Sequence, residues 1–446
     1  MLSRRSVLSV LTCGSLTGPW LFNAFHSRAV AGETRTRKNI DQLTPQEVAD
    51  YGYAISILRK RSEVNPNDPA GYDYQAALHN ADRTHPDGTV GSCEHGSEEF
   101  LPWHRIHLLL FEDLLRASDP PRTSNITLPY WNWQENASGK RFPKAFEDTA
   151  SPLFHAGRWG VDAGPAQWDP ADIAVAINED DWNLFAGDAK PAPSYGYLEL
   201  HAHNTMHGTI GPTMGDPGTA AEDPIFWSFH SFIDLTWARW QRLNSQTAQN
   251  GAATVWVEPE SRTVNQMIVA TMDLGYLYEF DFAADGEAEI QMAGTRTTNA
   301  LSPDRVGLRA MTTSVAAPTK EGARRLLKLV GVSPSLEASY EILVYVHPAG
   351  FDPLAGGPSS ERDGFLIDRL VIWKGRAGHG HHGGASVYVD LSKANGRDLL
   401  DGWQLTVVTS ALPLVPPAER VNLQDSVNDR LASISNLIQR LEIEER

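Results

Sequence analysis

The stretch from Glu199 to Gln241 constrains this chain of 446 residues more than any other part of its sequence. His203 and His207 stand four residues apart, so on a helix their imidazoles lie one turn apart on one face and reach one metal ion. A loop rich in Gly and Pro follows, and a second helix that opens after Asp223-Pro224 carries His230. Three imidazoles without cysteine suit copper, zinc or iron, and the order of affinities favours copper.

A second histidine triple lies upstream, at His79, His95 and His104. The residues around His104 predict a helix, because Pro102 stands in its first turn and leucines recur behind it at helical spacing. A short helix over 72–80 is expected to deliver His79. Six histidines in two sets of three predict two metal ions that face each other inside a helical bundle, where facing helices usually build such sites.

Several segments resemble the tyrosinase and polyphenol oxidase family of type 3 copper proteins. The segments HGSEEFLPWHR, HNTMH and DPIFWSFHSFIDLTWARW look like its two copper signatures, and LPYWNW resembles its PYWDW segment. The histidine spacing agrees with bacterial tyrosinases, with sixteen residues from His79 to His95 and nine more to His104. The resemblance covers roughly residues 39–242, and the chain is identified from it as a bacterial, exported member of the family.

The resemblance implies a dinuclear site that holds two copper ions and acts on small phenols with O2. The expected reactions are hydroxylation of a monophenol to an o-diphenol and oxidation of an o-diphenol to an o-quinone. Two alternatives stay open: a catechol or o-aminophenol oxidase without hydroxylase activity, and a hemocyanin-like O2 carrier. The implied copper ligands are His79, His95, His104, His203, His207 and His230.

Other residues match positions around the family's copper ions. Glu199 and Asn204 resemble its water-holding pair near the second copper, and their presence predicts monophenol hydroxylation as well as diphenol oxidation. Phe226 matches an aromatic residue packed near the metals. Arg105 and Asp234 resemble its charged pair that links two helices.

Other cysteine and histidine residues leave alternatives open. Cys93, two residues before His95, resembles the cysteine that fungal tyrosinases bond to the ligand ring as a thioether; the alternative is a free buried cysteine. His85 competes with His79 but stands in a THPDG turn, and His107 is the rival of His104 on the same helical face. His155 is expected to be structural.

The N-terminal residues 1–31 resemble a twin-arginine signal peptide. SRRSVL is followed by an apolar run and by the small-residue site AVA, which predicts export to the periplasm or the extracellular space. Gly14, Gly18 and Pro19 make the apolar run a poor membrane span. The formal net charge of −17 argues against nucleic acid and against an anionic membrane surface as partners.

The predicted fold class is mainly α: a four-helix-bundle dicopper core, a C-terminal antiparallel β-sandwich and a terminal helix. The dicopper domain is assigned to 32–311, with helical structure continuing to about residue 310, and a linker to 312–322. Residues 323–415 change to the period of strands in LLKLVGV, YEILVYV, FLIDRLVIWK, ASVYVDL and WQLTVVT. By position they resemble the domain that covers the active site of plant and fungal polyphenol oxidases. Pro217 and Gly218 replace a bulky aromatic of many plant enzymes, so the entrance is open unless this domain fills it.

The last segment, 416–446, predicts an amphipathic helix that either docks on the protein or pairs subunits into a homo-oligomer. A glycine-rich tract between two strands, GHGHHGG, reads as a hairpin tip or as a transient copper site. The prediction of a helix over 416–446 depends on apolar residues at alternating spacings of four and three: Val427, Leu431, Ile434, Ile438 and Leu441.

Overall fold

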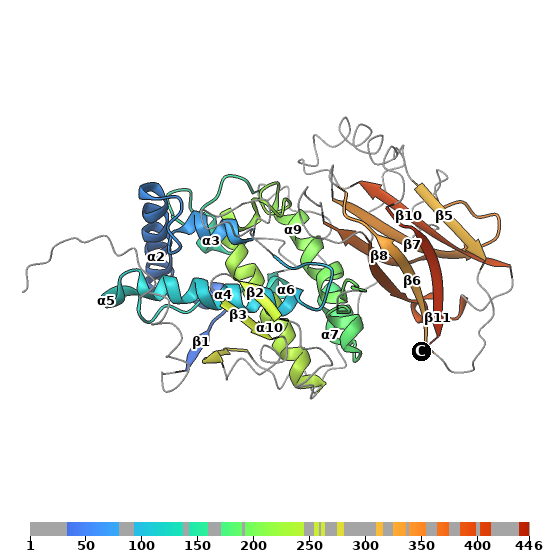
Figure 1. The fold of residues 1–446 in the computed structure, drawn as a ribbon, viewed down its shortest axis with the longest axis horizontal. Coiled ribbons are helices and arrows are strands. Elements are labelled where there is room, and N and C mark those ends of the chain that lie inside the picture. The colour runs from blue at the N-terminus through green and yellow to red at the C-terminus, as the bar shows by residue number, and fades with distance from the viewer. Residues whose placement is uncertain are drawn as a thin grey trace, which may run out of the picture.

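The structure is a computed structural model that describes residues 34–79, 93–136, 142–158, 171–189, 192–244, 254–257, 260–263, 274–280, 309–314, 324–335, 339–353, 364–373, 384–397, 402–411 and 437–445. The predicted signal peptide, residues 378–383 of the GHGHHGG tract and His85 lie outside these ranges. Figure 1 shows a helical part and a strand-rich part side by side. No helix among the described residues is both long enough and apolar enough to cross a membrane.

Two helices near the N-terminus lead to the first histidine. At the start of α2 (Pro45–Val64), the Thr44 hydroxyl accepts the N–H of Glu47 at 3.2 Å and the Glu47 carboxylate accepts the N–H of Thr44 at 2.8 Å, a complete capping box. α3 (Tyr72–Leu78) is buried along almost its whole length. A helix this short depends on packing rather than on its own propensity, and His79 follows directly at its C-terminal end.

The centre of the helical part is formed by α4 (Phe100–Ala117) and α10 (Ile225–Leu243). From its start through Trp237, α10 is buried on every side, as a helix without a solvent face should be. The Arg105 guanidinium of α4 donates to the Asp234 carboxylate of α10 and lies 3.5 Å from the Trp237 ring. This pair joins the two helices that carry His104 and His230.

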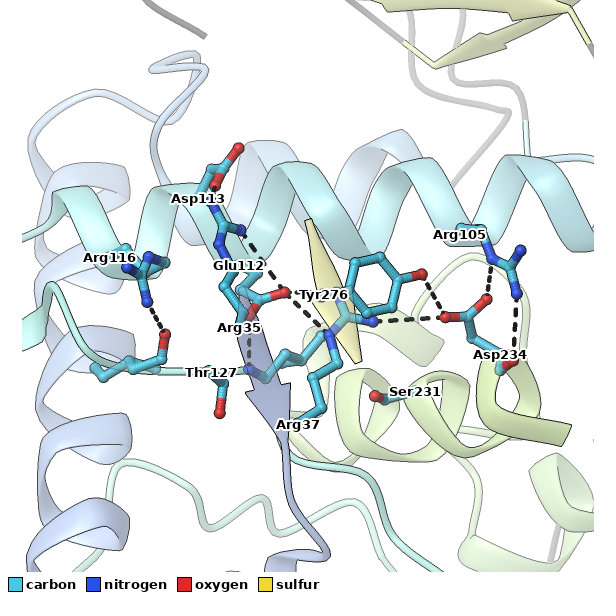
Figure 2. Close-up of polar contacts among 12 residues, drawn as sticks. Arg35, Arg37, Arg105, Glu112, Asp113, Arg116, Thr127, Ser231, Asp234 and Tyr276 are labelled. Atoms are coloured by element: carbon cyan, nitrogen blue, oxygen red, sulfur yellow. Dashed lines mark hydrogen bonds and ion pairs between the residues drawn. The ribbon is translucent and has the colours of Figure 1, made fainter. Parts of the chain in front are cut away.

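The start of the described chain is tied to the same two helices. β1 (Arg35–Arg37) pairs in parallel with β4 (Tyr276–Tyr278) and places Arg37 in the interior with 0% of its surface exposed. Its guanidinium donates to the Glu112 carboxylate of α4 at 2.5 Å, as Figure 2 shows. Burial of a charge is tolerated here because an opposite charge lies within hydrogen-bonding distance.

Asp234 completes this arrangement. Its carboxylate accepts the hydroxyls of Tyr276 and Tyr278 at 2.6 Å each. The Tyr276 ring lies 3.9 Å from the Arg37 guanidinium, and Figure 2 shows Tyr276 between Arg37 and Asp234. Burial would raise the pKa of Asp234, yet the positive charges of Arg105 and Arg37 hold that pKa below its usual value. We call this group the N-terminal clasp; it consists of Arg37, Glu112, Asp234, Tyr276 and Tyr278.

Shorter elements complete the helical part. They are η1 (Ile40–Gln42), α5 (Pro120–Thr123), α6 (Trp133–Asn136), η2 (Lys144–Phe146), α7 (Ala171–Ile177), α8 (Trp182–Phe185), η4 (Leu198–His203), α9 (Asn204–Ile210), η5 (Ala220–Glu222), β2 (Thr254–Val257) and β3 (Glu260–Thr263). The expectation of helical structure up to about residue 310 was wrong, because the elements described after α10 are the strands β2 to β5.

The strand-rich part, here called the β domain, confirms all five predicted strands. They are β6 (Arg325–Val332), β7 (Tyr340–Pro348), β8 (Leu366–Ile372), β9 (Ala385–Asp390) and β10 (Trp403–Ala411). With β5 (Arg309–Ser314) and β11 (Arg440–Glu445) they form two antiparallel sheets, in the orders β5-β10-β7-β8 and β11-β6-β9. Apolar side chains of both sheets share one core, among them Leu329, Val344, Val387 and Val407.

Two predicted boundaries of the β domain need correction. The predicted linker over 312–322 is wrong in its first residues, because Thr312 and Thr313 belong to β5 and pair with Thr406 and Leu405 of β10. The predicted helix over 416–446 is wrong over 440–445, where β11 pairs with β6. Leu441 fits the helical spacing that starts at Val427, and it also fits the strand-like alternation of apolar and charged residues over 440–445. The sequence pattern alone therefore did not decide between a helix and a strand. Residues 412–436 lie outside the described ranges.

The β domain packs directly on the helical part. Arg324, just before β6, donates to Glu179 of the helical part at 2.7 and 2.9 Å and to Asp390 of β9 at 2.7 and 2.9 Å. The backbones of Tyr195 and Ser386 are joined by an N–H to carbonyl bond of 3.0 Å. The two parts are therefore connected by charge pairs and by backbone contacts as well as by apolar packing.

Candidate metal centre

The structure brings together all six histidines that the sequence singles out. His79 ends α3, His95 lies in the loop before α4, and His104 lies in the second turn of α4. A wide π-helical turn, η4, ends at His203 and continues as α9 with His207, while His230 lies within α10. π-helical turns occur often at functional sites, and this one precedes the second pair of histidines.

The rings form two adjacent sets. Centroids in the first set are 5.3–5.7 Å apart, and in the second set 4.4–5.4 Å apart. His104 and His230 join the two sets, with stacked rings 4.3 Å apart. Ring nitrogens lie within 4.8 Å of one another in the group His79, His104 and His230 and in the group His203, His207 and His230.

Hydrogen bonds orient the rings. In five of the six histidines Nδ1 lies against an acceptor, so Nδ1 carries the proton and Nε2 keeps its lone pair for a metal ion. The acceptors are the carbonyl of Pro217 for His79 at 2.9 Å, the Glu199 carboxylate for His95 at 2.9 Å, the carbonyl of Phe100 for His104 at 2.8 Å, the Asn204 side-chain oxygen for His203 at 2.9 Å and the carbonyl of Met214 for His207 at 2.7 Å.

The remaining nitrogens fit metal binding. The buried Nε2 atoms of His104 and His203 have no hydrogen-bond partner among the described residues. The Nε2 atoms of His207 and His230 lie 3.3 Å apart, a separation expected of two nitrogens that share one metal ion at about 2 Å in a tetrahedron. Buried polar atoms without partners are costly, and a bound ion would satisfy these.

The protonation states of the histidines also fit metal binding. Burial, together with the neighbouring imidazoles, lowers the pKa of His104, His203, His207 and His230 well below 6.5. The rings are therefore neutral at physiological pH, which is the form that binds metal. An all-imidazole donor set fits copper, and it contains no thiolate or carboxylate donor in the two histidine groups.

Glu199 and Asn204 both lie in contact with metal-facing histidines. The Glu199 carboxylate accepts Nδ1–H of His95 and the backbone N–H of Gly96 at 3.0 Å, and burial raises the pKa of Glu199 well above its usual value. The Asn204 side-chain oxygen accepts Nδ1–H of His203, and its amide nitrogen donates to the backbone carbonyl of Val371 in β8 at 2.7 Å. Each residue therefore orients one ring, and Asn204 also contacts the β domain.

The other predicted neighbours lie close to the histidines. The Phe226 ring centroid is 4.8 Å from that of His79 and 4.3 Å from that of His230. Cys93 is buried, and its sulfur lies within 4.8 Å of ring nitrogens of His79 and His95. The Arg105–Asp234 pair lies one layer further out, between α4 and α10.

The rival histidines lie elsewhere. His107 faces Trp103 and Trp227, with ring centroids 4.9 and 4.8 Å away, and its Nε2–H donates to the Gln75 carbonyl at 3.1 Å. His155 accepts the backbone N–H of Gly157 at 3.0 Å. Neither belongs to a group of ring nitrogens close enough to share a metal ion among the described residues.

Trp373 is the residue at this site that the sequence did not reveal. It directly follows β8, and its ring centroid lies 4.1 Å from that of His207, 5.4 Å from His95 and 5.6 Å from His203. Its indole N–H donates to the Gly215 carbonyl at 2.6 Å. In the sequence Trp373 is one more apolar residue of a predicted strand. The related signal in the sequence is that Pro217 and Gly218 stand in place of a bulky aromatic residue, which left open that the C-terminal domain fills the entrance.

Comparisons with known proteins agree with this geometry. The chain matches the family described as the common central domain of tyrosinase over residues 69–164 and 158–243. It is 28% identical over 275 residues to a tyrosinase of Hahella sp., and this alignment covers 50% of this chain and 56% of that protein. It is also 27% identical over 235 residues to units G and H of a hemocyanin of Sepia officinalis, 47% of this chain and 38% of that protein.

Among solved structures, a latent aurone synthase, described as a polyphenol oxidase, has the same fold. The TM-score is 0.63 at 19% sequence identity, and the match covers 93% of this chain and 90% of that one. The similarity thus extends through the β domain, whereas the matched sequence regions centre on the six histidines. On the family match and the two histidine sets together, residues 69–243 are a tyrosinase central domain of the type 3 copper family, and the histidine sets fit the pair of copper ions that this family binds.

Proposed function

We propose that the protein is an exported, copper-dependent phenol oxidase that its β domain keeps in a latent form. It hydroxylates monophenols to o-diphenols and oxidises o-diphenols to o-quinones with O2. The observation that carries the proposal is the placement of Trp373, whose aromatic ring lies against histidines of both sets. A planar aromatic ring therefore fits in front of both metal positions, where a phenol has to lie.

In this proposal each residue around the metals has a defined task. His79, His95 and His104 hold one copper ion, and His203, His207 and His230 hold the other. When bound, the copper pair supplies redox chemistry that couples oxidation of a phenol to reduction of O2. The carbonyls and side chains on the Nδ1 atoms keep the rings in place through the reaction.

Hydroxylation of a monophenol also needs a proton acceptor, because a phenol with a pKa near 10 is hardly ionised at neutral pH. Glu199 serves that task together with Asn204. Burial raises the pKa of Glu199, so in its ionised form the carboxylate holds a proton more strongly than an exposed one does. Asn204 holds His203 and becomes available to solvent or substrate when the Val371 carbonyl moves away.

Latency in this proposal depends on three contacts of the β domain. Trp373 covers the histidines, Val371 engages Asn204, and Arg324 bridges Glu179 and Asp390. We also propose a four-helix bundle for the metal core, a sandwich for the β domain, and export of the protein by the twin-arginine route. A thioether between Cys93 and His95 belongs to the same proposal; a peptide mass lower by two hydrogens tests it.

An O2 carrier is the second candidate, because the sequence is also similar to a hemocyanin. A diphenol oxidase without hydroxylase activity is the third. All three share the metal centre, so the contacts around the six histidines are common to them. They differ in turnover, and turnover decides between them.

The test is O2 uptake by the copper-loaded protein with tyrosine and with a catechol. A protease site is inserted between β4 and β5, because β5 belongs to the β domain and a cut after it would leave a strand behind. Uptake with both substrates, stronger after the cut, is the expected result. Uptake with catechol alone discards the proton-acceptor role of Glu199 and Asn204. Reversible O2 binding without turnover, cut or uncut, makes the protein a carrier.

A further inference from the structure

The side chain of Trp373 lies in front of the histidines of the metal centre. Only 6% of its surface is exposed, and its ring lies near His79 and His95 of one set and His203 and His207 of the other. The interplanar angle to His207 is 30° at 4.1 Å, close to an offset stack. The position of this indole therefore indicates the shape and the polar groups of a molecule that can bind in front of the histidines.

The polar contact of this indole is specific. Its N–H donates to the carbonyl of Gly215 at 2.6 Å. The neighbouring carbonyls are already used for the metal centre, because Met214 accepts from His207 at 2.7 Å and Pro217 accepts from His79 at 2.9 Å. One short loop thus orients a histidine of each set and offers the Gly215 carbonyl to whatever aromatic ring lies in front of them.

The loop has hydrogen bonds of its own that do not involve Trp373. The Gly215 N–H donates to the Gly211 carbonyl at 2.7 Å, the Thr219 hydroxyl to the Thr213 carbonyl at 2.9 Å, and the Gly218 N–H to the Asp216 carboxylate at 2.9 Å. These bonds lie within the loop and involve no residue of the β domain. We therefore expect the Gly215 carbonyl to stay in place when Trp373 leaves, and then to lack a donor.

We propose that the Gly215 carbonyl is a specificity-determining acceptor, and that the opened site prefers fused bicyclic phenols with a ring N–H, the hydroxyindoles. This inference rests on the proposed phenol oxidation and names its substrate class. A hydroxyindole can stack on His207 as Trp373 does and donate its N–H to Gly215. A substrate of equal shape without the N–H leaves a carbonyl unpaired in a buried site, which costs about tenfold in affinity.

The first experiment uses the full-length, copper-free Trp373→Gly variant, which removes the indole and keeps the β domain. Added indole is compared with N-methylindole, which has nearly the same shape and no N–H donor. We expect indole to raise the melting temperature of the variant and to bind about tenfold more tightly than N-methylindole. Wild-type protein is the matched control, because Trp373 already fills the position and indole should change nothing. Equal binding of the two probes to the variant overturns the inference.

A second variant covers the case in which Trp373→Gly does not fold. Trp373→Leu keeps an apolar side chain at the interface and removes the donor. In its copper-loaded form, 5-hydroxyindole is compared with N-methyl-5-hydroxyindole by O2 uptake, and we expect a KM about tenfold lower for the first. Equal KM values overturn the inference while leaving phenol oxidation intact. Preferential binding of indole without turnover of any phenol supports the Gly215 site and instead refutes the proposed function.

Discussion

His107 shows how strongly the interior of the helical part controls a single residue. It stands three residues after His104, yet its imidazole is enclosed by Trp103 and Trp227 and donates to the Gln75 carbonyl. Burial lowers the pKa of His107 to about 3, so the ring stays neutral in the folded protein. His107 thus packs among aromatic rings and also satisfies the Gln75 carbonyl.

The low pKa of His107 makes stability depend on pH. In the unfolded chain the ring binds a proton below about pH 6.5, whereas the folded protein does not until about pH 3, so stability is lost as the pH falls through this window. His107→Gln keeps a donor for Gln75 and cannot titrate. Between pH 7 and pH 5 we expect the variant to lose about 2 kcal/mol less unfolding free energy than the parent protein. Chemical denaturation of the copper-free protein at both pH values measures this, and identical losses would contradict the assignment.

At the scale of elements, the N-terminal clasp connects strands far apart in the chain with the two helices that carry His104 and His230. β1 and β4 are too short to be stable as an isolated pair, so the clasp depends on burial of Arg37 between Glu112 and Asp234 (Figure 2). The clasp therefore fixes the position of α4 relative to α10, the two helices that carry His104 and His230.

Removal of the Arg37 charge should destabilise the protein strongly, because the buried Glu112 carboxylate loses its nearest positive charge and Asp234 keeps Arg105 as its charged partner. We expect Arg37→Met to lower the unfolding free energy by about 3–5 kcal/mol. Arg35→Met is the matched control on the same strand, since Arg35 is partly exposed beside Asp113, and should cost about 1 kcal/mol or less. Denaturant midpoints of both copper-free variants measure the difference, and equal losses would show that the clasp is not the stabilising feature.

At the scale of the whole molecule, the proposed latency makes the β domain decide what reaches the metal centre. Arg324 makes a charged contact between the two parts, and its guanidinium is shared by Glu179 and Asp390. The neighbouring carboxylates raise the pKa of Arg324 above its usual value, so it stays charged at any working pH. The closed arrangement therefore depends on an ion pair that salt can weaken as well as on Trp373.

Loss of this ion pair should favour the open arrangement. We expect Arg324→Gln to raise phenol oxidation by the uncut protein about fivefold, which corresponds to about 1 kcal/mol for a partly exposed pair. Arg369→Gln is the matched control, because Arg369 pairs with Glu341 inside the β domain. The rate of cleavage at the protease site between β4 and β5 gives a readout that is independent of turnover. No change in either quantity would assign latency to Trp373 and Val371 alone.

Local patterns in the sequence predicted much of this structure. The strands of the β domain and the helices around the histidines follow from periodicity and capping, because those signals act over a few residues. The boundaries failed where a short segment pairs with a distant strand: Thr312 joins β10, and Leu441 joins β6. Such pairing depends on which edges the fold leaves open, and neighbouring residues do not encode that.

At the metal centre, too, local sequence signals predicted some features and contacts between distant residues decided others. The sequence by itself determined the two histidine triples, because ligand chemistry and helical spacing are local properties, and the copper pair and the family followed from the resemblance of its motifs. Only the tertiary structure decided that Trp373 faces His207, that Asn204 bonds to Val371 and that the Gly215 carbonyl is offered to an aromatic ring. Those contacts join residues more than a hundred positions apart, and packing of one domain on the other creates them.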